Sequence, residues 1–195
     1  MERTARIVQI VVAVGFGALL ALKVRSQRRL GERSIVLDPR PRVAVGEVLA
    51  IGGLFAWVAL LAVHGLGAAH RSFGPVLLDL PVARGVGILL ALGGLAWTGR
   101  AWSDMGAAWR IGVDRAAPPR LVERGLFARS RNPIYVGIDV LALAAFGMTG
   151  TLFHALSALL ILAGVHARIR HEEYWMASVH GAEWERYRAR VPRYL

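Results

Sequence analysis

The chain of 195 residues contains no cysteine. A disulfide, a thiolate nucleophile and a cysteine-type zinc site are therefore excluded, and cysteine usage says nothing about the redox compartment. Charged residues are scarce, at 19%, and only 13 are Asp or Glu against 24 Lys or Arg. The sequence also lacks a strand followed by a glycine-rich turn and a helix, which excludes a soluble Rossmann-type cofactor domain.

Hydrophobic residues, by contrast, make up 55% of the chain, and the mean hydropathy is +0.47. Both values are well above those of an average soluble domain and indicate a membrane protein. The net charge of +11 could suggest a nucleic-acid partner. The arginines, however, fall in blocks between apolar runs, as they do in cytoplasmic loops of membrane proteins, so no nucleic-acid partner is expected.

Apolar runs predict about five transmembrane helices. Residues 7–22, 43–63 and 85–102 are each close to the roughly 20 residues that span a bilayer core. Residues 134–165 are apolar around the turn signal Gly147-Met-Thr-Gly150, which predicts a C-terminal helical hairpin; its arms are short, so a re-entrant pair is the alternative. We therefore expect an all-α integral membrane protein that forms a single domain, 1–195, with N-terminal helices in 1–98.

Three polar segments, 23–42, 100–131 and 168–195, contain most of the arginines. Five spans that start outside place all three segments in the cytoplasm, which agrees with the positive-inside rule, although Arg3 and Arg6 oppose this orientation weakly. The tail 168–195 is expected to form a cytosolic helix on the protein or the membrane face. No small-residue cleavage site follows the first apolar run, so we expect a retained anchor.

One segment at a predicted membrane surface, 129–137, has the sequence Arg-Ser-Arg-Asn-Pro-Ile-Tyr-Val-Gly. Asn132 before a proline is typical of a helix start, so one interpretation is that its side chain caps the helix. The functional interpretation is that Arg131 and the helix N-terminus bind a small anionic group. Tyr135 would then offer its ring or hydroxyl to the ligand, and Gly137 would allow close approach to the backbone.

A second group of candidates, His171-Glu172-Glu173, follows the last apolar run. Adjacent carboxylates do not share a helix face, so we expect no paired acid and base; one should face a ligand and the other an arginine. The alternative is a solvated acidic patch that balances Arg168 and Arg170. A carboxylate beside an aromatic cleft would suit a ribose diol.

Other polar residues in the apolar half give weaker indications. His166 and His171 lie five positions apart without further ligands, so no metal site is expected. Asp139 lies within a predicted span and should face the protein or a cavity, with an arginine as its partner. Helix-packing positions are expected at four glycines, Gly85, Gly87, Gly93 and Gly94.

Several motifs follow one another in a fixed order over residues 99–195. They are Leu121-Val-Glu-Arg-Gly-Leu-Phe127, Arg131-Asn-Pro-Ile-Tyr-Val-Gly137, the hydrophobic hairpin, Glu172-Glu-Tyr-Trp-Met176, Gly181-Ala-Glu-Trp-Glu-Arg-Tyr187 and Val191-Pro-Arg-Tyr-Leu195. This order resembles the isoprenylcysteine carboxyl methyltransferase family, and the related phospholipid methyltransferases share part of it. The chain departs from the family pattern at Asn132, where many members have histidine, at His180, where an aromatic is usual, and at Trp184, where tyrosine is usual.

The resemblance implies a membrane enzyme that binds S-adenosylmethionine on its cytoplasmic side. The residues expected at the cofactor are Leu126, Arg131, Asn132, Pro133, Tyr135, Gly137, Glu172 and Glu173. Arg131 with the helix start would suit the cofactor carboxylate, an acidic residue the ribose diol, and Tyr135 the sulfonium cation or the adenine. Catalytic roles are expected for Arg131, Glu173 and Arg190, where Arg190, or alternatively Arg186, would hold an acceptor carboxylate.

The acceptor is expected to be a lipophilic molecule that enters from the bilayer through a gap between helices. The best expectation is the carboxylate of an isoprenylcysteine-like or other isoprenoid or lipid substrate. A carboxylate needs no general base, whereas an amine, a phenol or a thiol must lose a proton. The alternatives are a phospholipid or amine N-methyltransferase, an NADPH-dependent membrane reductase of the sterol reductase type, and a non-catalytic scaffold. The expected location is a bacterial inner membrane, and the sequence predicts no oligomeric state.

Overall fold

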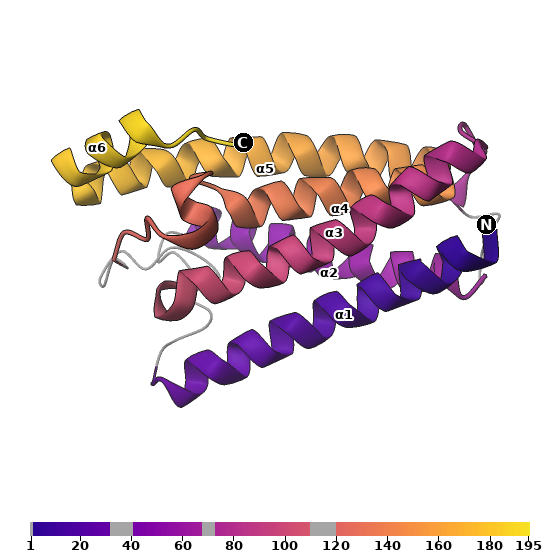
Figure 1. The fold of residues 1–195 in the computed structure, drawn as a ribbon, viewed down its shortest axis with the longest axis horizontal. Helices are drawn as coiled ribbons and strands as arrows, with labels where there is room; N and C mark the ends of the chain where they lie inside the picture. Colours follow the sequence, from indigo (N-terminus) through magenta and orange to yellow (C-terminus); the bar gives the residue numbers. More distant parts are fainter. Residues whose placement is uncertain (1, 32–40, 68–72, 110–119) are drawn as a thin grey trace.

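The computed structural model describes residues 2–31, 41–67, 73–109 and 120–195, and it is built of helices (Figure 1). Their order is α1 (Glu2–Arg29), α2 (Pro41–Gly65), α3 (Pro81–Met105), the short 3-10 helices η2 (Gly106–Ala108) and η3 (Gly125–Ala128), α4 (Pro133–Thr149), α5 (Leu152–His180) and α6 (Ala182–Arg190). The described residues contain no strand apart from an isolated bridge between Val76 and Thr151. The all-α prediction is confirmed.

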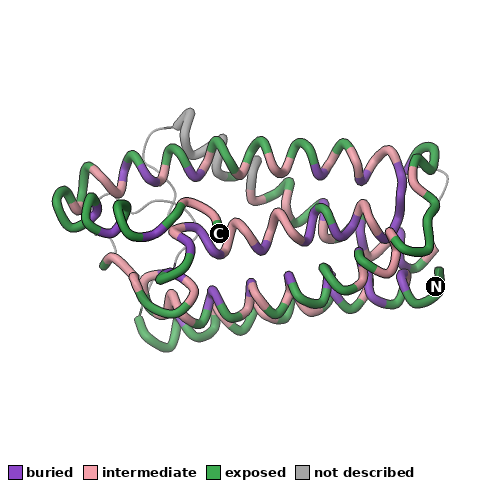
Figure 2. The backbone as a smooth tube through the Cα atoms, turned by 45° about the horizontal axis from the view of Figure 1, so that its top comes forward, coloured by how far each residue is buried: buried purple, intermediate pink, exposed green. Residues whose placement is uncertain are grey.

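Three helices are long and apolar enough to cross a bilayer: Glu2–Arg29, Pro81–Ala108 and Leu152–His180. Two shorter apolar helical stretches are Ile51–Gly65 and Pro133–Thr149. Helices α1 to α5 run back and forth along one long axis (Figure 1). Exposed positions recur along these helices between the buried ones (Figure 2), and they include large apolar side chains such as Leu89 and Leu160. An apolar exterior of this kind suits contact with lipid, and the chain is a membrane protein.

Helices α3 and α4 pack closely because glycines remove side chains from their interface. A Cβ atom added at Gly87 would lie 2.7 Å from the backbone of α4, and one at Gly137 would lie 2.2 Å from Thr98 Oγ1. The packing role predicted for Gly87 and Gly94 is confirmed, whereas that for Gly93 is wrong, because Gly93 faces open space. Gly137 was expected to allow a ligand to approach, but it allows α3 to approach instead.

Helix α1 continues beyond the stretch predicted to span the membrane. Lys23, which was expected to begin a loop, lies within the helix, and its Nζ donates hydrogen bonds of 2.8 Å to the carbonyl oxygens of Trp102 and Gly106. Its charge thus lies at the C-terminal end of α3, where free carbonyl groups favour a cation. Residues 32–40 of the polar segment 23–42 lie outside the described residues, and Pro41 begins α2.

Helix α5 also runs further than predicted. The tail was expected to form a separate helix from Arg168, but α5 continues without interruption to His180, and only Ala182–Arg190 forms a helix of its own. Nothing between residues 165 and 180 breaks a helix, and Gly181 then ends α5 with a φ of 50°. At about 1.5 Å per residue, the 29 residues of α5 extend about 43 Å, longer than a bilayer core of about 30 Å.

The predicted helical hairpin is confirmed. Gly150, with a φ of 66°, ends α4, and Thr151 begins α5 by accepting a hydrogen bond from the backbone of His154. Gly147, predicted to belong to the turn, is still helical. Because α5 returns along α4, the start of α4 lies beside the region of α5 around residue 170.

Candidate active site

The junction before α4 is held by hydrogen bonds to distant segments. Asn132 occupies the N-cap position, but its side chain makes no capping hydrogen bond. Its Nδ2 instead donates to Glu173 Oε1 at 3.0 Å and to the carbonyl oxygen of Arg193 at 3.2 Å. Ser130 Oγ accepts from the backbone N–H of Asn132 at 3.1 Å. The capping role predicted for the Asn132 side chain is therefore wrong, and that side chain connects α4 to α5 and to the C-terminal segment.

Glu173 is the centre of this junction, because both of its oxygens pair with arginines. Arg131 Nε lies 3.0 Å from Oε1, while Nε and Nη2 of Arg193 lie 3.0 and 2.8 Å from Oε2. The side chains of Arg131 and Glu173 are only 8% and 9% exposed, whereas that of Arg193 is 38% exposed. The hydrogen bond to Glu173 raises the pKa of the Arg193 guanidinium. Glu173 is thus a nearly buried carboxylate with two charge-assisted partners.

Arg131 also binds the last turn of α6 and the segment that follows it. Its Nη1 donates to the carbonyl oxygens of Arg188 and Val191 at 3.0 and 2.8 Å, and its backbone N–H donates to Pro192 at 2.9 Å. Its guanidinium carbon lies 5.9 Å from the centre of the Trp184 ring. Since Nε and Nη1 are already hydrogen-bonded within the chain, the geometry supports a positioning role for Arg131 more directly than the binding of a cofactor carboxylate.

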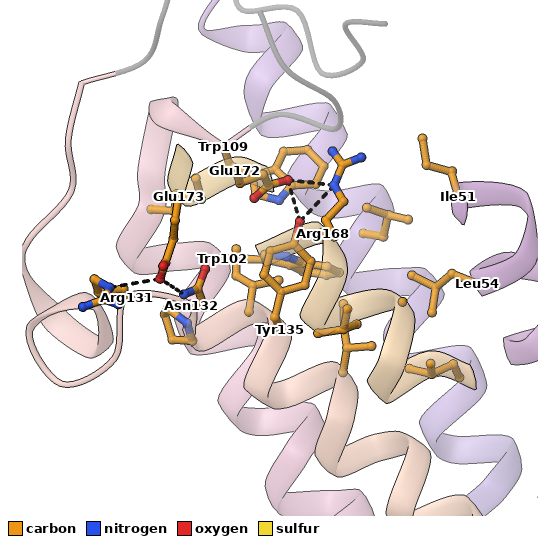
Figure 3. A pocket seen from close by; sticks show the side chains of 18 of the residues that line it. Ile51, Leu54, Trp102, Trp109, Arg131, Asn132, Tyr135, Arg168, Glu172 and Glu173 are labelled. Atoms are coloured by element: carbon orange, nitrogen blue, oxygen red, sulfur yellow. Dashed lines mark hydrogen bonds and ion pairs between the residues drawn. The ribbon is translucent and has the colours of Figure 1, made fainter. Parts of the chain in front are cut away.

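Glu172 belongs to a second polar group, shown beside the first in Figure 3. The hydroxyl of Tyr135 donates to Glu172 Oε1 at 2.7 Å, and Arg168 Nε donates to the same oxygen at 2.8 Å and to the Tyr135 hydroxyl at 3.3 Å. Glu172 and Glu173 face different directions, as predicted. Both pair with arginines, and the expectation that one of them also faces a ligand stays a prediction.

Helix α6 packs against η3 through Tyr187. The Tyr187 hydroxyl donates to the carbonyl oxygen of Phe127 at 2.7 Å, and the ring lies among Trp184, Val191 and the partly buried Leu121. Burial raises the pKa of the Tyr187 phenol, an effect that the nearby Arg131 opposes. The neutral phenol therefore donates a hydrogen bond that holds the C-terminal helix over the site.

A cavity of about 700 Å³ begins at these groups and extends into the bundle. Its polar end is lined by Arg120, Arg131, Asn132, Tyr135, Arg168, Glu172 and Glu173. Its apolar part is lined by residues of α2 and α5, among them Ile51, Leu54, Trp57, Phe153, Ser157 and Gly164. In Figure 3, Ile51 and Leu54 lie across an open space from Tyr135 and Arg168. A cavity of this size can hold one or more small molecules.

Two tryptophans form part of the cavity wall near its polar end. The rings of Trp102 and Trp109 lie 6.0 Å apart, edge to face. The Nε1 of Trp102 is buried and has no hydrogen-bond partner among the described residues. The two rings therefore contribute aromatic surface to this part of the wall.

Three residues expected at the site do not line the cavity. The backbone N–H of Leu126 donates to Asp104 Oδ2 at 2.9 Å, so this residue helps to fix η3. Arg190 lies on the exposed surface and pairs with Glu123 at 2.6 Å. Gly137 packs against α3. The remaining expected residues, Arg131, Asn132, Pro133, Tyr135, Glu172 and Glu173, line one cavity.

The structure brings to the site several residues that the sequence did not assign to it. Arg168 was expected only to balance a solvated acidic patch, although its spacing to Glu172 places both on one helix face. Arg193 and Trp102 reach the site only through the tertiary fold. Asp139 is half-buried, but its Oδ1 has no hydrogen-bond partner among the described residues, so the predicted arginine partner is not found there.

Comparison with known protein families identifies the family of this chain. The family model described as phospholipid methyltransferase matches residues 82–183, slightly more than half of the chain. The chain belongs to the phospholipid methyltransferase family. The family match begins in α3 and ends in the first turn of α6, so it includes Arg131, Tyr135, Glu172 and Glu173 but not Arg193. A search of curated proteins gave no match.

This family membership confirms the resemblance found in the sequence and makes the chain a membrane methyltransferase by family. It argues against the membrane reductase alternative, whose chemistry is hydride transfer.

Proposed function

We propose that the protein is an S-adenosylmethionine-dependent membrane methyltransferase that acts on a lipophilic acceptor. The observation that carries the proposal is that one cavity joins a charged end, at Arg168 and Glu172, to an apolar space between α2 and α5. The charged end suits a water-soluble cofactor, and the apolar space suits the acceptor. The family match supports methyl transfer as the reaction.

The residues at the polar end fit this cofactor. S-adenosylmethionine would supply an activated methyl group on a sulfonium cation. Tyr135, Trp102 and Trp109 contribute aromatic rings to the cavity wall, and aromatic faces attract a cation. Glu172 offers an acceptor for a ribose diol beside these rings. We propose that Arg131 acts by holding Glu173 and the C-terminal segment in place, so it is a positioning residue.

The state of the carboxylates favours an acceptor that needs no general base. Glu172 is bound by Arg168 and Tyr135, and Glu173 is bound by Arg131 and Arg193, so both carboxylates are already engaged by partners within the chain. No histidine or aspartate is found in the cavity lining among the described residues. A carboxylate acceptor, as in an isoprenylcysteine-like or other isoprenoid or lipid acid, is already a nucleophile, and the enzyme then mainly aligns it and excludes water.

We propose five spans in a bacterial inner membrane with the site on the cytoplasmic side, and the distribution of charge supports this sidedness. The end of the bundle that holds the site carries the arginines at the end of α1, around η3 and in the C-terminal segment. The other end has fewer cations, and two of them, Arg6 and Arg84, are paired with acidic residues. We propose that the site end lies in the cytoplasm, in agreement with the positive-inside rule.

Calorimetry on the protein in lipid nanodiscs tests the cofactor. We expect S-adenosylhomocysteine to bind and NADPH not to bind. Trp102→Phe, which replaces an indole ring of the cavity wall with a phenyl ring that attracts a cation less strongly, should weaken binding about fivefold. Trp97→Phe is a matched control, because Trp97 does not line the cavity. Binding of NADPH with no response to S-adenosylhomocysteine would refute the proposal.

The family description favours one second candidate, a phospholipid amine as acceptor. The two products differ in chemistry, because a methyl ester is cleaved by mild base and an N-methyl group is not. Protein in nanodiscs would be supplied with methyl-labelled S-adenosylmethionine and either N-acetyl-S-farnesylcysteine or phosphatidylethanolamine. We expect base-labile label from the carboxylate acceptor; base-stable label from the amine alone would select the second candidate.

A further inference from the structure

A second cavity, of about 580 Å³, lies between α1 and α2, and we call it the α1 groove. It is lined by Gly17, Leu20, Ala21, Val24, Arg25, Arg28 and Phe55. All of these residues except Phe55 belong to α1 and recur every three or four positions, so they share one face of that helix. Leu20 and Phe55 also line the larger cavity, but the polar residues of the candidate active site do not line the groove. The groove is therefore separate from that site.

The two helices touch at one end of the bundle and leave a space between them toward the other. At the end away from the candidate active site, His64 Nδ1 lies 3.1 Å from Gln9 Oε1, and a Cβ atom added at Gly65 would lie 2.9 Å from the carbonyl oxygen of Arg6. Further along α1, a Cβ atom added at Gly17 would meet no heavy atom within 4 Å. No side chain of the described residues therefore fills the space beside Gly17.

Two arginines stand at the membrane-surface end of the groove. Arg25 and Arg28 follow the apolar run 7–22 of α1 by about one and two turns. On the opposite face of this part of α1, Lys23 donates to carbonyl oxygens at the end of α3, so the two helices end at a similar depth. The guanidinium groups thus lie just beyond the hydrocarbon core, at the level of phospholipid headgroups.

Neither arginine is used by the described part of the chain. The side chains of Arg25 and Arg28 are exposed, and they make no hydrogen bond or ion pair with a described residue. By contrast, Arg6 and Arg84 at the other end of the bundle each pair with a carboxylate. No acidic residue is found in the groove lining among the described residues. The groove therefore joins two unpaired positive charges to an apolar floor, which is complementary to an anionic lipid.

We propose that the α1 groove binds one anionic phospholipid, whose phosphodiester lies between Arg25 and Arg28 and one of whose acyl chains lies along the groove as far as Gly17. At about 1.5 Å per residue, the distance along α1 from Val24 to Gly17 is about 10 Å. One leaflet of a bilayer core of about 30 Å is about 15 Å deep, so the groove takes the upper part of one acyl chain.

Charge selects this lipid, and packing places it. The acyl chain is already among hydrocarbon in the bilayer, so it gains little from the hydrophobic effect on entering the groove. Each arginine near an anionic headgroup favours binding about fivefold. The bound chain packs against Leu20 and Phe55, and Phe55 is otherwise 46% exposed. Because these two side chains also line the larger cavity, the lipid supports the wall of that cavity from outside and is not the acceptor.

Native mass spectrometry of the full chain in detergent micelles measures the number and identity of bound lipids. The probes are phosphatidylglycerol and phosphatidylcholine with identical acyl chains at equal mole fraction. We expect one phosphatidylglycerol to be retained with an apparent Kd about tenfold lower than that of phosphatidylcholine. Arg25→Gln/Arg28→Gln should remove this preference. Equal retention of the two lipids by the wild type would overturn the inference.

A charge-matched variant separates the groove from the net charge of the protein. Arg29→Gln/Arg129→Gln also removes two exposed arginines, but neither residue lines the groove. The preference of this control for phosphatidylglycerol should stay within about twofold of the wild-type value. A loss in the control as large as that in Arg25→Gln/Arg28→Gln would show that net charge alone attracts the lipid, and it would overturn the inference.

A second pair of variants tests the apolar part of the groove. Gly17→Leu fills the space beside α1 and should raise the Kd of phosphatidylglycerol about fivefold. Gly93→Leu is its control, because Gly93 of α3 has the same open surroundings and lines neither cavity, and it should leave the Kd unchanged. Equal Kd values for Gly17→Leu and the wild type would show that no acyl chain lies in the groove.

Two other occupants are outcomes of the same measurement. Glycerol 3-phosphate carries a phosphate without acyl chains, and displacement of the lipid by it would make this a site for soluble phosphates. A protein dimer that Gly17→Leu dissociates would assign the groove to a second copy of the chain. Either result would overturn the inference. Binding is measured without cofactor or turnover, so its outcome is independent of the proposed function.

Discussion

The pair formed by Arg131 and Glu173 offers a quantitative test of how the site is held together. Both side chains are nearly buried, so breaking the pair by Glu173→Gln should cost about 3 to 5 kcal/mol of unfolding free energy, since an uncompensated charge is left inside. In a double-mutant cycle with Arg131→Met, the coupling energy should be about 2 to 3 kcal/mol. The double-mutant cycle of Glu173→Gln with Arg193→Met should give a coupling energy of less than about 1 kcal/mol, because Arg193 is substantially exposed and screened by solvent.

The assay is reversible unfolding in mixed micelles, followed by tryptophan fluorescence. The pair of Glu185 and Arg188 on α6 is the control: its atoms lie 2.7 Å apart, but both side chains are about half exposed, and its coupling should not exceed about 0.5 kcal/mol. A coupling for Arg131 and Glu173 as small as that of the control pair would refute the claim that a buried ion pair holds the junction.

Three further predictions concern single positions. Tyr135→Phe removes the hydroxyl that donates to Glu172, and the affinity for S-adenosylhomocysteine should fall about three- to tenfold by calorimetry without loss of fold; an unchanged affinity would show that this hydroxyl is not used. Gly137→Ala places a methyl group against Thr98 and should destabilise the protein by about 1 to 3 kcal/mol in the same micelle assay, and a neutral result would contradict the close packing of α3 and α4. Burial raises the pKa of Tyr187 in the folded protein, so its contribution to stability is complete below the unfolded value of about 10 and is lost as pH rises above it. The free energy of unfolding of Tyr187→Phe should therefore fall less than that of the wild type as the pH rises above about 10. Identical curves of unfolding free energy against pH for the variant and the wild type would contradict this.

Periodic features of the sequence predicted the fold well. Runs of apolar residues indicated the five long helices, and the turn at Gly150 indicated the hairpin, because these signals are local. The ends of α1 and α5 were missed for a physical reason: Lys23 and Arg168 looked like surface charges in the sequence. In the folded chain Lys23 binds carbonyl oxygens at the end of α3, and Arg168 pairs within its own helix, so neither ends the helix.

Candidate site residues were predicted where a motif and a helix start coincided. Arg131, Asn132, Tyr135 and the two glutamates do line one cavity. The pairing of Glu173 with Arg193 could not be predicted, because Arg193 reaches Glu173 only when the C-terminal segment folds back across α4. For the same reason the role expected for Asn132 changed, since a distant carboxylate binds its side chain in place of the local backbone.

The central claim, that one cavity joins a cofactor to a lipophilic acceptor, is tested most directly by methyl transfer into membrane lipids. Purified protein in nanodiscs would be incubated with methyl-labelled S-adenosylmethionine and total membrane lipid extract, beside a Gly164→Leu sample. We expect label in the organic phase, released as methanol by mild base, and less of it with Gly164→Leu. Absence of label from the organic phase, together with transfer to a water-soluble acceptor, would contradict the account.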